Sequence, residues 1–201
     1  MFIKASKFER LVKEAYKDGN LHIGCEDHHI MTSGTRWMIA MDRDEIPKEL
    51  LAVMIKYAGR LPDEEECWLV TDEGLQSELP DAFMSMADLD DEEHEWHQID
   101  PTGVLLEQKT KVYALYQRLF GSTRVIAVNA LHTVVVDPGE IDMSGGERPV
   151  RGPFVDQGYT MIVWENDRMQ FQIHGVKGRP DSSWAQLLEF FEQRCIRGIG
   201  E

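Results

Sequence analysis

The chain has little cysteine and no long apolar run. Its three cysteines, Cys25, Cys67 and Cys195, lie far apart in 201 residues and form no CxxC pair. The sequence therefore encodes neither a disulfide framework nor a zinc ribbon, and free thiols are typical of a reducing cytoplasm. No hydrophobic stretch approaches the ~20 residues of a membrane span, and the N-terminal segment lacks the apolar core of a signal peptide. These absences predict a cytoplasmic protein with no membrane partner.

Nucleotide-binding and catalytic motifs are also absent. There is no GxxxxGK[ST], no GxGxxG and no GxSxG, and an EF-hand loop aligned from Asp88 would place Glu93 at the glycine position and Ile99 at the glutamate position. Cys25 is close in sequence to His28, but the neighbouring acids would raise the pKa of its thiol, the wrong direction for a nucleophile. An enzyme is therefore not favoured, and we predict no catalytic residue, no cofactor and no tight metal site.

Basic residues are missing from one long segment. Residues 61–108, the acidic window, contain sixteen acids and no lysine or arginine. The chain has a net charge of −15, and the other 20 acids and all 21 bases lie outside this window. Such segregation repels phosphate backbones and attracts basic partners or cations. The alternative is an acidic surface that only maintains solubility. The acids are Asp63, Glu64, Glu65, Glu66, Asp72, Glu73, Glu78, Asp81, Asp88, Asp90, Asp91, Glu92, Glu93, Glu95, Asp100 and Glu107.

The densest part of the acidic window is DDEEHEWHQID at residues 90–100, with two histidines three apart. The spacing HEWH is one residue short of the zinc motif HExxH. A metal-dependent enzyme that uses His28 or His29 together with His94 and His97 is one alternative. The favoured interpretation is a protein-binding acidic face with pH-sensitive histidines. The residues of this predicted face are Asp88, Asp90, Asp91, Glu92, Glu93, His94, Glu95 and His97.

Basic and aromatic residues alternate just after the acidic window, in KTKVYALYQRLFGSTR. In a strand, Lys109, Lys111 and Tyr113 would share one face, and with Arg118 they could form a platform for nucleic acid. The alternative is a core strand whose aromatic residues are strand-forming residues. Nucleic-acid binding therefore stays open without being favoured.

Three helices are predicted by apolar residues at helical spacing. The first lies within residues 1–19 and carries a capping box at Ser6 and Glu9. The second, within 46–62, begins at Pro47 and stops at Gly59. The third, within 181–195, has Trp184, Leu187, Leu188 and Phe191 on one face and a capping box at Ser183 and Gln186. We expect the apolar faces of all three to join one core.

Strands are predicted between the helices, two of them as hairpins with turns at 72–74 and 165–167. The segments 80–98 and 138–158 read as irregular, the second as a surface loop rich in glycine and proline. The order suggests a duplication of a strand-helix-hairpin unit, with a pseudo-repeat at 20–80 and 103–176. The expected fold is a single α+β domain over residues 1–201, with largely antiparallel sheet and about three packed helices. The predicted strands are 21–24, 35–42, 67–79, 103–117, 124–129, 131–137 and 159–176.

The stretches GTRWMIAMDRDEIPKELLAVMIKYAGRLP and TGVLLEQKTKVYALYQ resemble a small family of uncharacterised proteins of bacterial genomes and their prophages. The resemblance covers about residues 20–120 and implies a phage or mobile-element origin, but no activity and no functional residues. The helix-plus-hairpin duplication is also similar in outline to sliding-clamp domains, which is an analogy of fold.

The leading hypothesis is a non-enzymatic interaction protein that binds a basic protein partner through its acidic window. Three alternatives come from other classes. They are a clamp-like factor associated with nucleic acid through residues 109–124, a mimic of DNA charge, and the metal-dependent enzyme described above. The oligomeric state is not encoded in any recognisable pattern.

Overall fold

The computed structural model describes residues 2–78, 86–90, 95–118, 124–137, 150–176 and 183–193. The helices are α1 Ala5–Lys17, α2 Lys48–Ala58, α3 Ala130–Thr133 and α5 Ser183–Glu192, and a 3-10 turn, η1, spans Arg43–Glu45. The strands are β1 Leu21–Glu26, β2 His29–Gly34, β3 Trp37–Asp42, β4 Cys67–Thr71, β5 Gly74–Ser77, β6 Trp96–Gln108, β7 Lys111–Arg118, β8 Val125–Asn129, β9 Arg151–Asp156, β10 Met161–Asn166 and β11 Met169–His174.

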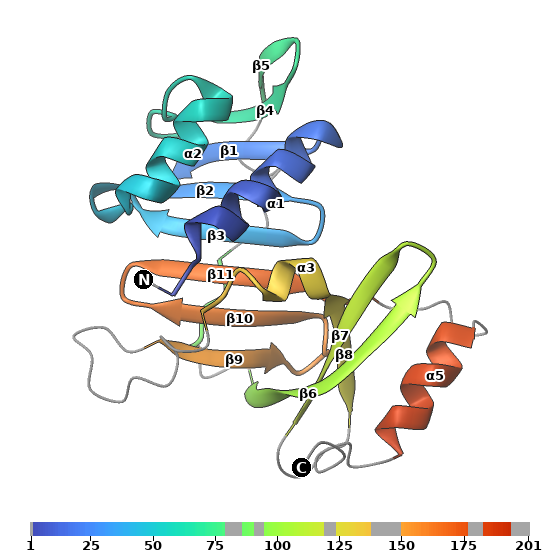
Figure 1. The fold of residues 1–201 in the computed structure, drawn as a ribbon. Helices are drawn as coiled ribbons and strands as arrows, with labels where there is room; N and C mark the ends of the chain where they lie inside the picture. The colour runs from blue at the N-terminus through green and yellow to red at the C-terminus, as the bar shows by residue number, and fades with distance from the viewer. Residues whose placement is uncertain are drawn as a thin grey trace. The chain divides into compact units, whose positions relative to one another are not determined.

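These strands form an 11-stranded antiparallel sheet with the order β5-β4-β1-β2-β3-β11-β10-β9-β6-β7-β8 (Figure 1). With three helices of ten or more residues, the predicted α+β class is confirmed. The order of the first five strands, β5-β4-β1-β2-β3, recurs at the other end as β10-β9-β6-β7-β8. No helix in the described part of the chain is both long and apolar enough to cross a membrane.

The chain divides into two compact units. Unit 1 comprises residues 1–87, 134–151 and 165–172, and unit 2 comprises residues 88–133, 152–164 and 173–201. The acidic window is therefore shared between the two units.

In unit 1, α1 buries one apolar face, as its spacing predicts. Phe8, Leu11, Val12 and Ala15 are all buried, and α1 packs against α2 and against β1 and β2. The predicted capping box at Ser6 is wrong, because the helix begins after Lys4 and no side chain caps it. Its start follows instead from main-chain pairing with residues 135–136, including a bond of 2.8 Å from the Lys4 amide to the Val135 carbonyl.

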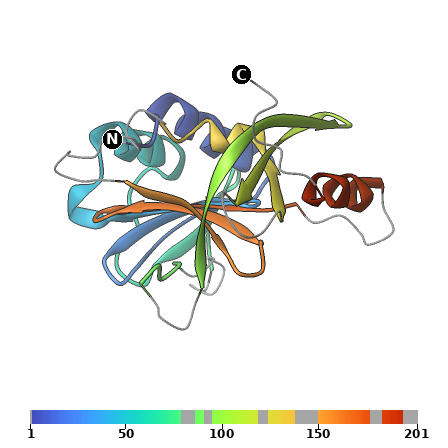
Figure 2. The ribbon, with the colours of Figure 1, turned by 90° about the horizontal axis from the view of Figure 1, so that it is seen from below.

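Helix α2 begins and ends as predicted. Pro47 precedes its first turn, and Gly59 ends it with φ +80°, a conformation that favours glycine. Leu50 and Met54 are fully buried. Seen from below in Figure 2, α1 and α2 both lie over one face of β1–β3.

The sequence prediction misses β2. The chain folds back from β1 through Asp27 and His28, which have φ +47° and +65°, and Glu26 pairs with His29 across the turn. A two-residue hairpin turn of type I′ needs positive φ at both positions, and Asn-Gly is its usual signal. The pair Asp-His satisfies the same geometry without that signal, so the hairpin is not recognisable from the sequence.

In unit 2, β6 and β7 form a long hairpin ribbon with a register shift between Pro101 and Leu105 (Figure 1). β7 pairs antiparallel with β8, and α5 packs against β8. A cluster of Tyr113, Leu115, Val125, Ala127 and Trp184 forms their core, with Leu188 and Phe191 packed at its margin. This cluster contains no residue of α1 or α2, so the expectation of a single core for all three helices is corrected: α5 packs on a cluster within its own unit.

Three local predictions are wrong. Residues 80–98 were expected to be irregular, but β6 begins at Trp96. Residues 131–137 were expected to form a strand, but α3 occupies 130–133, where the Asn129 side chain accepts a hydrogen bond of 3.0 Å from the Leu131 amide. Asparagine is a strong helix-capping residue, and here it outweighs the β-propensity of the valines that follow. Residues 138–158 were expected to be loop throughout, but β9 begins at Arg151; residues 138–149 lie outside the described part.

Candidate functional site

The acidic window contributes charge to each unit separately. Twelve of its sixteen acids lie in the described residues, seven in unit 1 and five in unit 2. The unit 1 acids are Asp63, Glu64, Glu65, Glu66, Asp72, Glu73 and Glu78, and the unit 2 acids are Asp88, Asp90, Glu95, Asp100 and Glu107. The predicted single face therefore consists of two groups, each with its own surroundings.

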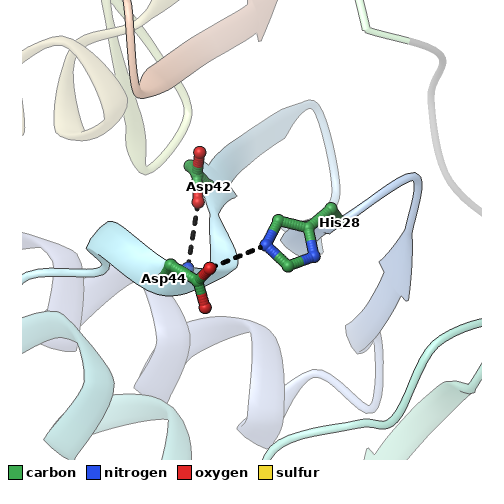
Figure 3. A group of neighbouring side chains, drawn as sticks. All are labelled: His28, Asp42 and Asp44. Atoms are coloured by element: carbon green, nitrogen blue, oxygen red, sulfur yellow. Dashed lines mark hydrogen bonds and ion pairs between the residues drawn. The ribbon is translucent and has the colours of Figure 1, made fainter.

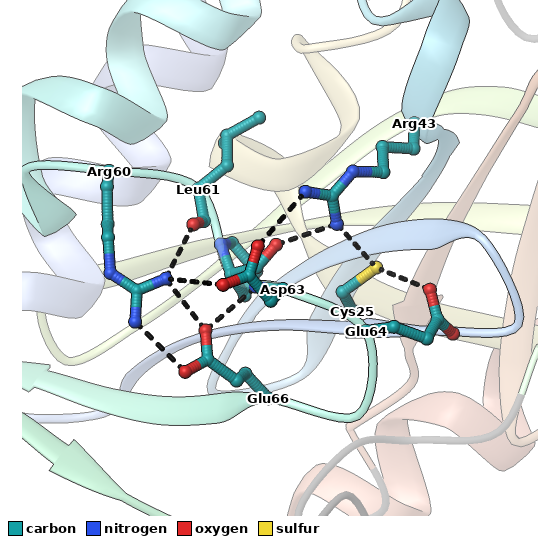
Figure 4. Close-up of polar contacts among 8 residues, drawn as sticks. Cys25, Arg43, Arg60, Leu61, Asp63, Glu64 and Glu66 are labelled. Atoms are coloured by element: carbon teal, nitrogen blue, oxygen red, sulfur yellow. Dashed lines mark hydrogen bonds and ion pairs between the residues drawn. The ribbon is translucent and has the colours of Figure 1, made fainter.

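The first acids of the window are held by an arginine that stands just before it. Arg60 contacts Glu66 through two nitrogens, at 2.7 and 2.9 Å, and lies 3.6 Å from Asp63 (Figure 4). Its guanidinium also lies 4.4 Å from the centre of the Trp68 ring. The bond from Arg60, together with one from the Asp63 amide, lowers the pKa of Glu66 to about 2. These carboxylates are therefore already partnered and are poor candidates for binding another protein.

A second arginine from outside the window reaches the same loop. Arg43 donates to the Pro62 carbonyl at 2.8 Å and to Cys25 Sγ at 3.3 Å, and it lies 3.7 Å from Asp63 (Figure 4). The thiol of Cys25 in turn lies 3.3 Å from Glu64 Oε2. Burial raises the pKa of the Cys25 thiol, and Glu64 raises it further. The direction agrees with the sequence argument, although burial rather than the acids is the larger cause, and it does not suit a catalytic nucleophile.

One group of side chains in the described residues has the composition of a metal site. His28, Asp42 and Asp44, here called the His28 cluster, offer ligand atoms within 4.8 Å of one another (Figure 3). His28 Nε2 lies 3.1 Å from Asp44 Oδ2, and Asp42 Oδ1 accepts the Asp44 amide at 2.9 Å as the cap of η1. Each group thus has a protein partner, and the His28 and Asp44 side chains are 57% and 80% exposed. The cluster differs from the ligand set considered from the sequence, in which His28 or His29 joined His94 and His97.

The other histidines considered as metal ligands from the sequence have different surroundings. His29 Nδ1 lies 2.8 Å from the Asp27 carbonyl. His97 is in β6, where it pairs with Val155, and it is buried with Nε2 3.5 Å from Glu95 Oε1. Because His97 lies on a strand, the helical spacing considered for HEWH does not apply. His94 lies outside the described residues.

The predicted acidic face at 88–97 is only partly described. Asp88 accepts the Asp90 amide on its side chain at 3.0 Å and the Trp96 indole on its carbonyl at 2.9 Å, so this stretch is folded back on itself. Asp91, Glu92, Glu93 and His94 lie outside the described residues. The face as a whole therefore stays a prediction.

In the segment predicted to bind nucleic acid, Lys109, Lys111 and Tyr113 do not share one face of a strand as expected. Lys109 lies in the turn between β6 and β7, with φ +56°, and Lys111 is exposed at the start of β7. Tyr113 is buried, and its ring packs 4.9 Å from that of Trp184, so it offers no surface on which a base could stack. Arg118 is half-buried at the end of β7. The interpretation of Tyr113 as a core residue, left open by the sequence, fits its position.

In the hairpin of β4 and β5, strand β5 is the most exposed strand of unit 1. β5 stands first in the strand order, and its four residues are all exposed. The Glu78 amide donates to the Cys67 carbonyl at 2.9 Å. Since inward and outward bonding alternate along an antiparallel pair, the main-chain groups of Leu75 and Ser77 are expected to face away from β4.

Two acids of this hairpin lie at one end of β5. Asp72 and Glu73 form the exposed turn of the hairpin, and Leu75 in β5 is 40% exposed. No ion pair involves either turn acid within the described residues. The sequence predicted the hairpin correctly, but it carried no signal that β5 would stand at an edge, because strand order is a tertiary property.

No family model and no curated protein matches the chain. Among solved structures it is similar to a putative DNA polymerase III beta subunit of Eubacterium rectale, at 12% identity and a TM-score of 0.39, over 90% of this chain and 65% of that one. It is also similar to the DNA polymerase III beta chain of Streptococcus pneumoniae, at 9% identity and a TM-score of 0.36, over 90% and 64% of the two chains.

The chain thus spans about two thirds of the length of these beta subunits. The outline similarity to sliding clamps that the sequence indicates is confirmed, as a weak structural similarity. Scores at this level assign neither a family nor an activity.

Proposed function

We propose that the protein is a non-enzymatic interaction module that binds a basic segment of a partner protein through its acidic window. The observation that carries the proposal is the exposed edge strand β5 beside the exposed turn acids Asp72 and Glu73, which form no ion pair with any other described residue. An open edge offers main-chain hydrogen bonds to an incoming strand. The carboxylates beside it select an extended segment that carries lysine or arginine.

Charge and main chain make separate contributions to this binding. Two opposite charges ~4 Å apart gain about 1 kcal/mol in water and several times more where water is partly excluded. Screening beyond ~10 Å at 0.1 M salt makes this part salt-dependent. The acids at 63–66 contribute less, because Arg43 and Arg60 already hold Asp63 and Glu66.

The second acidic group, at residues 88–97, is proposed to extend the binding surface. Exchanging Asp90, Asp91, Glu92 and Glu93 for Asn and Gln tests this part. Capture of a basic partner from the host at low salt should weaken in the variant while its circular dichroism stays unchanged. Unchanged capture would show that this run is only a solvated surface.

The main-chain contribution is tested with a fluorescent peptide of alternating lysine and valine. Ser77→Pro removes an amide that faces away from β4 and should leave the hairpin intact, since proline is tolerated on an edge strand. We expect weaker peptide binding by this variant. Gln76→Pro is the matched control, because it removes an amide on the β4 side and should loosen the hairpin itself. Full peptide binding by Ser77→Pro would contradict strand addition.

The other functions considered from the sequence predict different results. A clear gel shift of DNA by the unaltered protein would favour the nucleic-acid factor. Inhibition of a DNA-binding protein without any preference for extended peptides would favour a mimic of DNA charge.

A further inference from the structure

Unit 2 contains a pocket of about 350 Å³ between β8 and α5, here called the α5 pocket. Its other walls are residues 158–159, from the β9–β10 connection, and residues 175–176, which follow β11. The volume lies within the range of sites that hold small molecules. Val125, Val176 and Leu188 give the pocket an apolar lining.

Tyr159 is a buried residue of this wall. Its side chain belongs to a residue that is 6% exposed, and its hydroxyl has no hydrogen-bond partner within the described residues. The hydroxyl oxygen is sealed from solvent, so Tyr159 presents its ring and main chain to the pocket and not its hydroxyl.

The charges around the pocket are unequal. Arg124 stands at one wall, where its guanidinium lies 4.5 Å from the centre of the Tyr159 ring and donates to the Gln157 carbonyl at 3.2 Å. Glu189 and Glu192 line the opposite side from α5, three residues apart and hence on one helix face. Glu192 Oε1 accepts a long bond of 3.4 Å from the Val125 amide. Among the described residues that line the pocket, two carboxylates stand against one engaged guanidinium, a balance that favours a cation.

We propose that the α5 pocket binds a small molecule with an apolar body and a single amino group that is protonated at neutral pH. The apolar body lies against Val125, Val176 and Leu188, and the ammonium group is recognised by Glu189 and Glu192. This site is separate from the strand edge β5 and does not depend on the proposed protein partner.

Three aryl compounds of similar size test the chemistry by titration of amide resonances of the full-length chain. They are 2-phenylethylammonium, the neutral 2-phenylethanol and the anionic 3-phenylpropionate. We expect saturable chemical-shift changes at residues 125–127 and 175–176. The affinity should be highest for the ammonium compound and lowest for the carboxylate. Equal affinities for all three, or shifts confined to other residues, would overturn the proposal.

A double variant assigns the ammonium site. Glu189→Gln combined with Glu192→Gln keeps an acceptor for the Val125 amide but removes both charges. Affinity for the ammonium should fall by up to about fivefold, as for a partly solvated ion pair, while affinity for the alcohol stays the same. Tyr159→Phe is the control, because it removes only the sealed hydroxyl and should leave affinity for the ammonium unchanged. An unchanged affinity of the double glutamine variant for the ammonium would refute the assigned recognition.

A matched pair of filling variants locates the site. Leu188→Trp places a larger side chain in the pocket, whereas the neighbouring Leu187 is 36% exposed and does not line it. We expect Leu188→Trp to abolish the shifts and Leu187→Trp to retain them. If circular dichroism shows that Leu188→Trp is unfolded, Ala185→Leu fills the same pocket from the adjacent turn of α5. Retained binding in the folded filling variant would show that the ligand lies elsewhere.

Discussion

Trp184 is the residue on which the packing of α5 depends most. It is 5% exposed, its ring lies 4.9 Å from that of Tyr113, and its indole donates to the Val176 carbonyl at 3.3 Å. Truncation of a buried tryptophan to alanine commonly costs about 3–5 kcal/mol of unfolding free energy. That figure already includes the lost ring contact and the long hydrogen bond, so these are not added to it. We expect Trp184→Ala to fall within this range.

Urea denaturation followed by far-UV circular dichroism measures the change, and Leu187→Ala is the control from the same helix. Leu187 is 36% exposed, and its truncation should cost no more than about 0.5 kcal/mol, as at other surface sites. A loss below about 1 kcal/mol for Trp184→Ala would contradict this expectation. In that case α5 would not be held by the Tyr113 cluster, and the α5 pocket would lose one of its walls.

Three further predictions concern titratable and metal-binding groups. The pKa of Glu66 is depressed to about 2 in the folded chain, so its stabilising contribution is complete above its ordinary value near 4.5 and is lost as the pH falls from there toward 2; the difference in urea midpoint between the unaltered protein and Glu66→Gln should shrink over that range. Burial raises the thiol pKa of Cys25, and that of Cys67 to about 11, so a thiol reagent at pH 8 should label neither until the chain is unfolded. Protein purified without chelator should retain no stoichiometric zinc, iron or manganese through dialysis, because the His28 cluster is exposed and internally hydrogen-bonded; one retained equivalent would contradict this.

The sequence predicted those elements whose buried face or end depends on residues close together in the chain. The stripe of Phe8, Leu11, Val12 and Ala15 identified the buried face of α1, and Gly59 identified the end of α2. Capping was less predictable, since the start of α1 depends on pairing with residues 135–136, which are far away in the sequence. The short helix α3 did carry a local signal, the asparagine before it, which the valine-rich stretch obscured.

The candidate sites depended more on tertiary structure than the helices did. The acidic window was evident from composition, but its partners Arg43 and Arg60 lie outside it and reach it only through folding. The burial of Tyr113 depends on α5, some seventy residues later in the sequence. The α5 pocket combines four separate segments, none with a recognisable motif.

The duplication suggested by the sequence becomes a more specific proposal. We propose that residues 21–77 and 96–166 are the two copies, since each runs three strands, a helix and two strands, and the strand order within the sheet is the same. In this correspondence the β4–β5 hairpin matches β9 and β10, rather than the hairpin at 159–176 that the sequence comparison paired with it. A search for residual identity in this register among homologous chains would test it.

The most direct test of the proposed function is the salt dependence of peptide binding. The dissociation constant of the fluorescent lysine–valine peptide is measured by anisotropy at low and at high salt, for the unaltered protein and for Asp72→Asn combined with Glu73→Gln. We expect the unaltered protein to bind the peptide with an affinity that weakens steeply with salt, and the variant to bind more weakly and with less salt dependence. Identical affinity and identical salt dependence of the two proteins would contradict the claim that this acidic edge binds a basic partner.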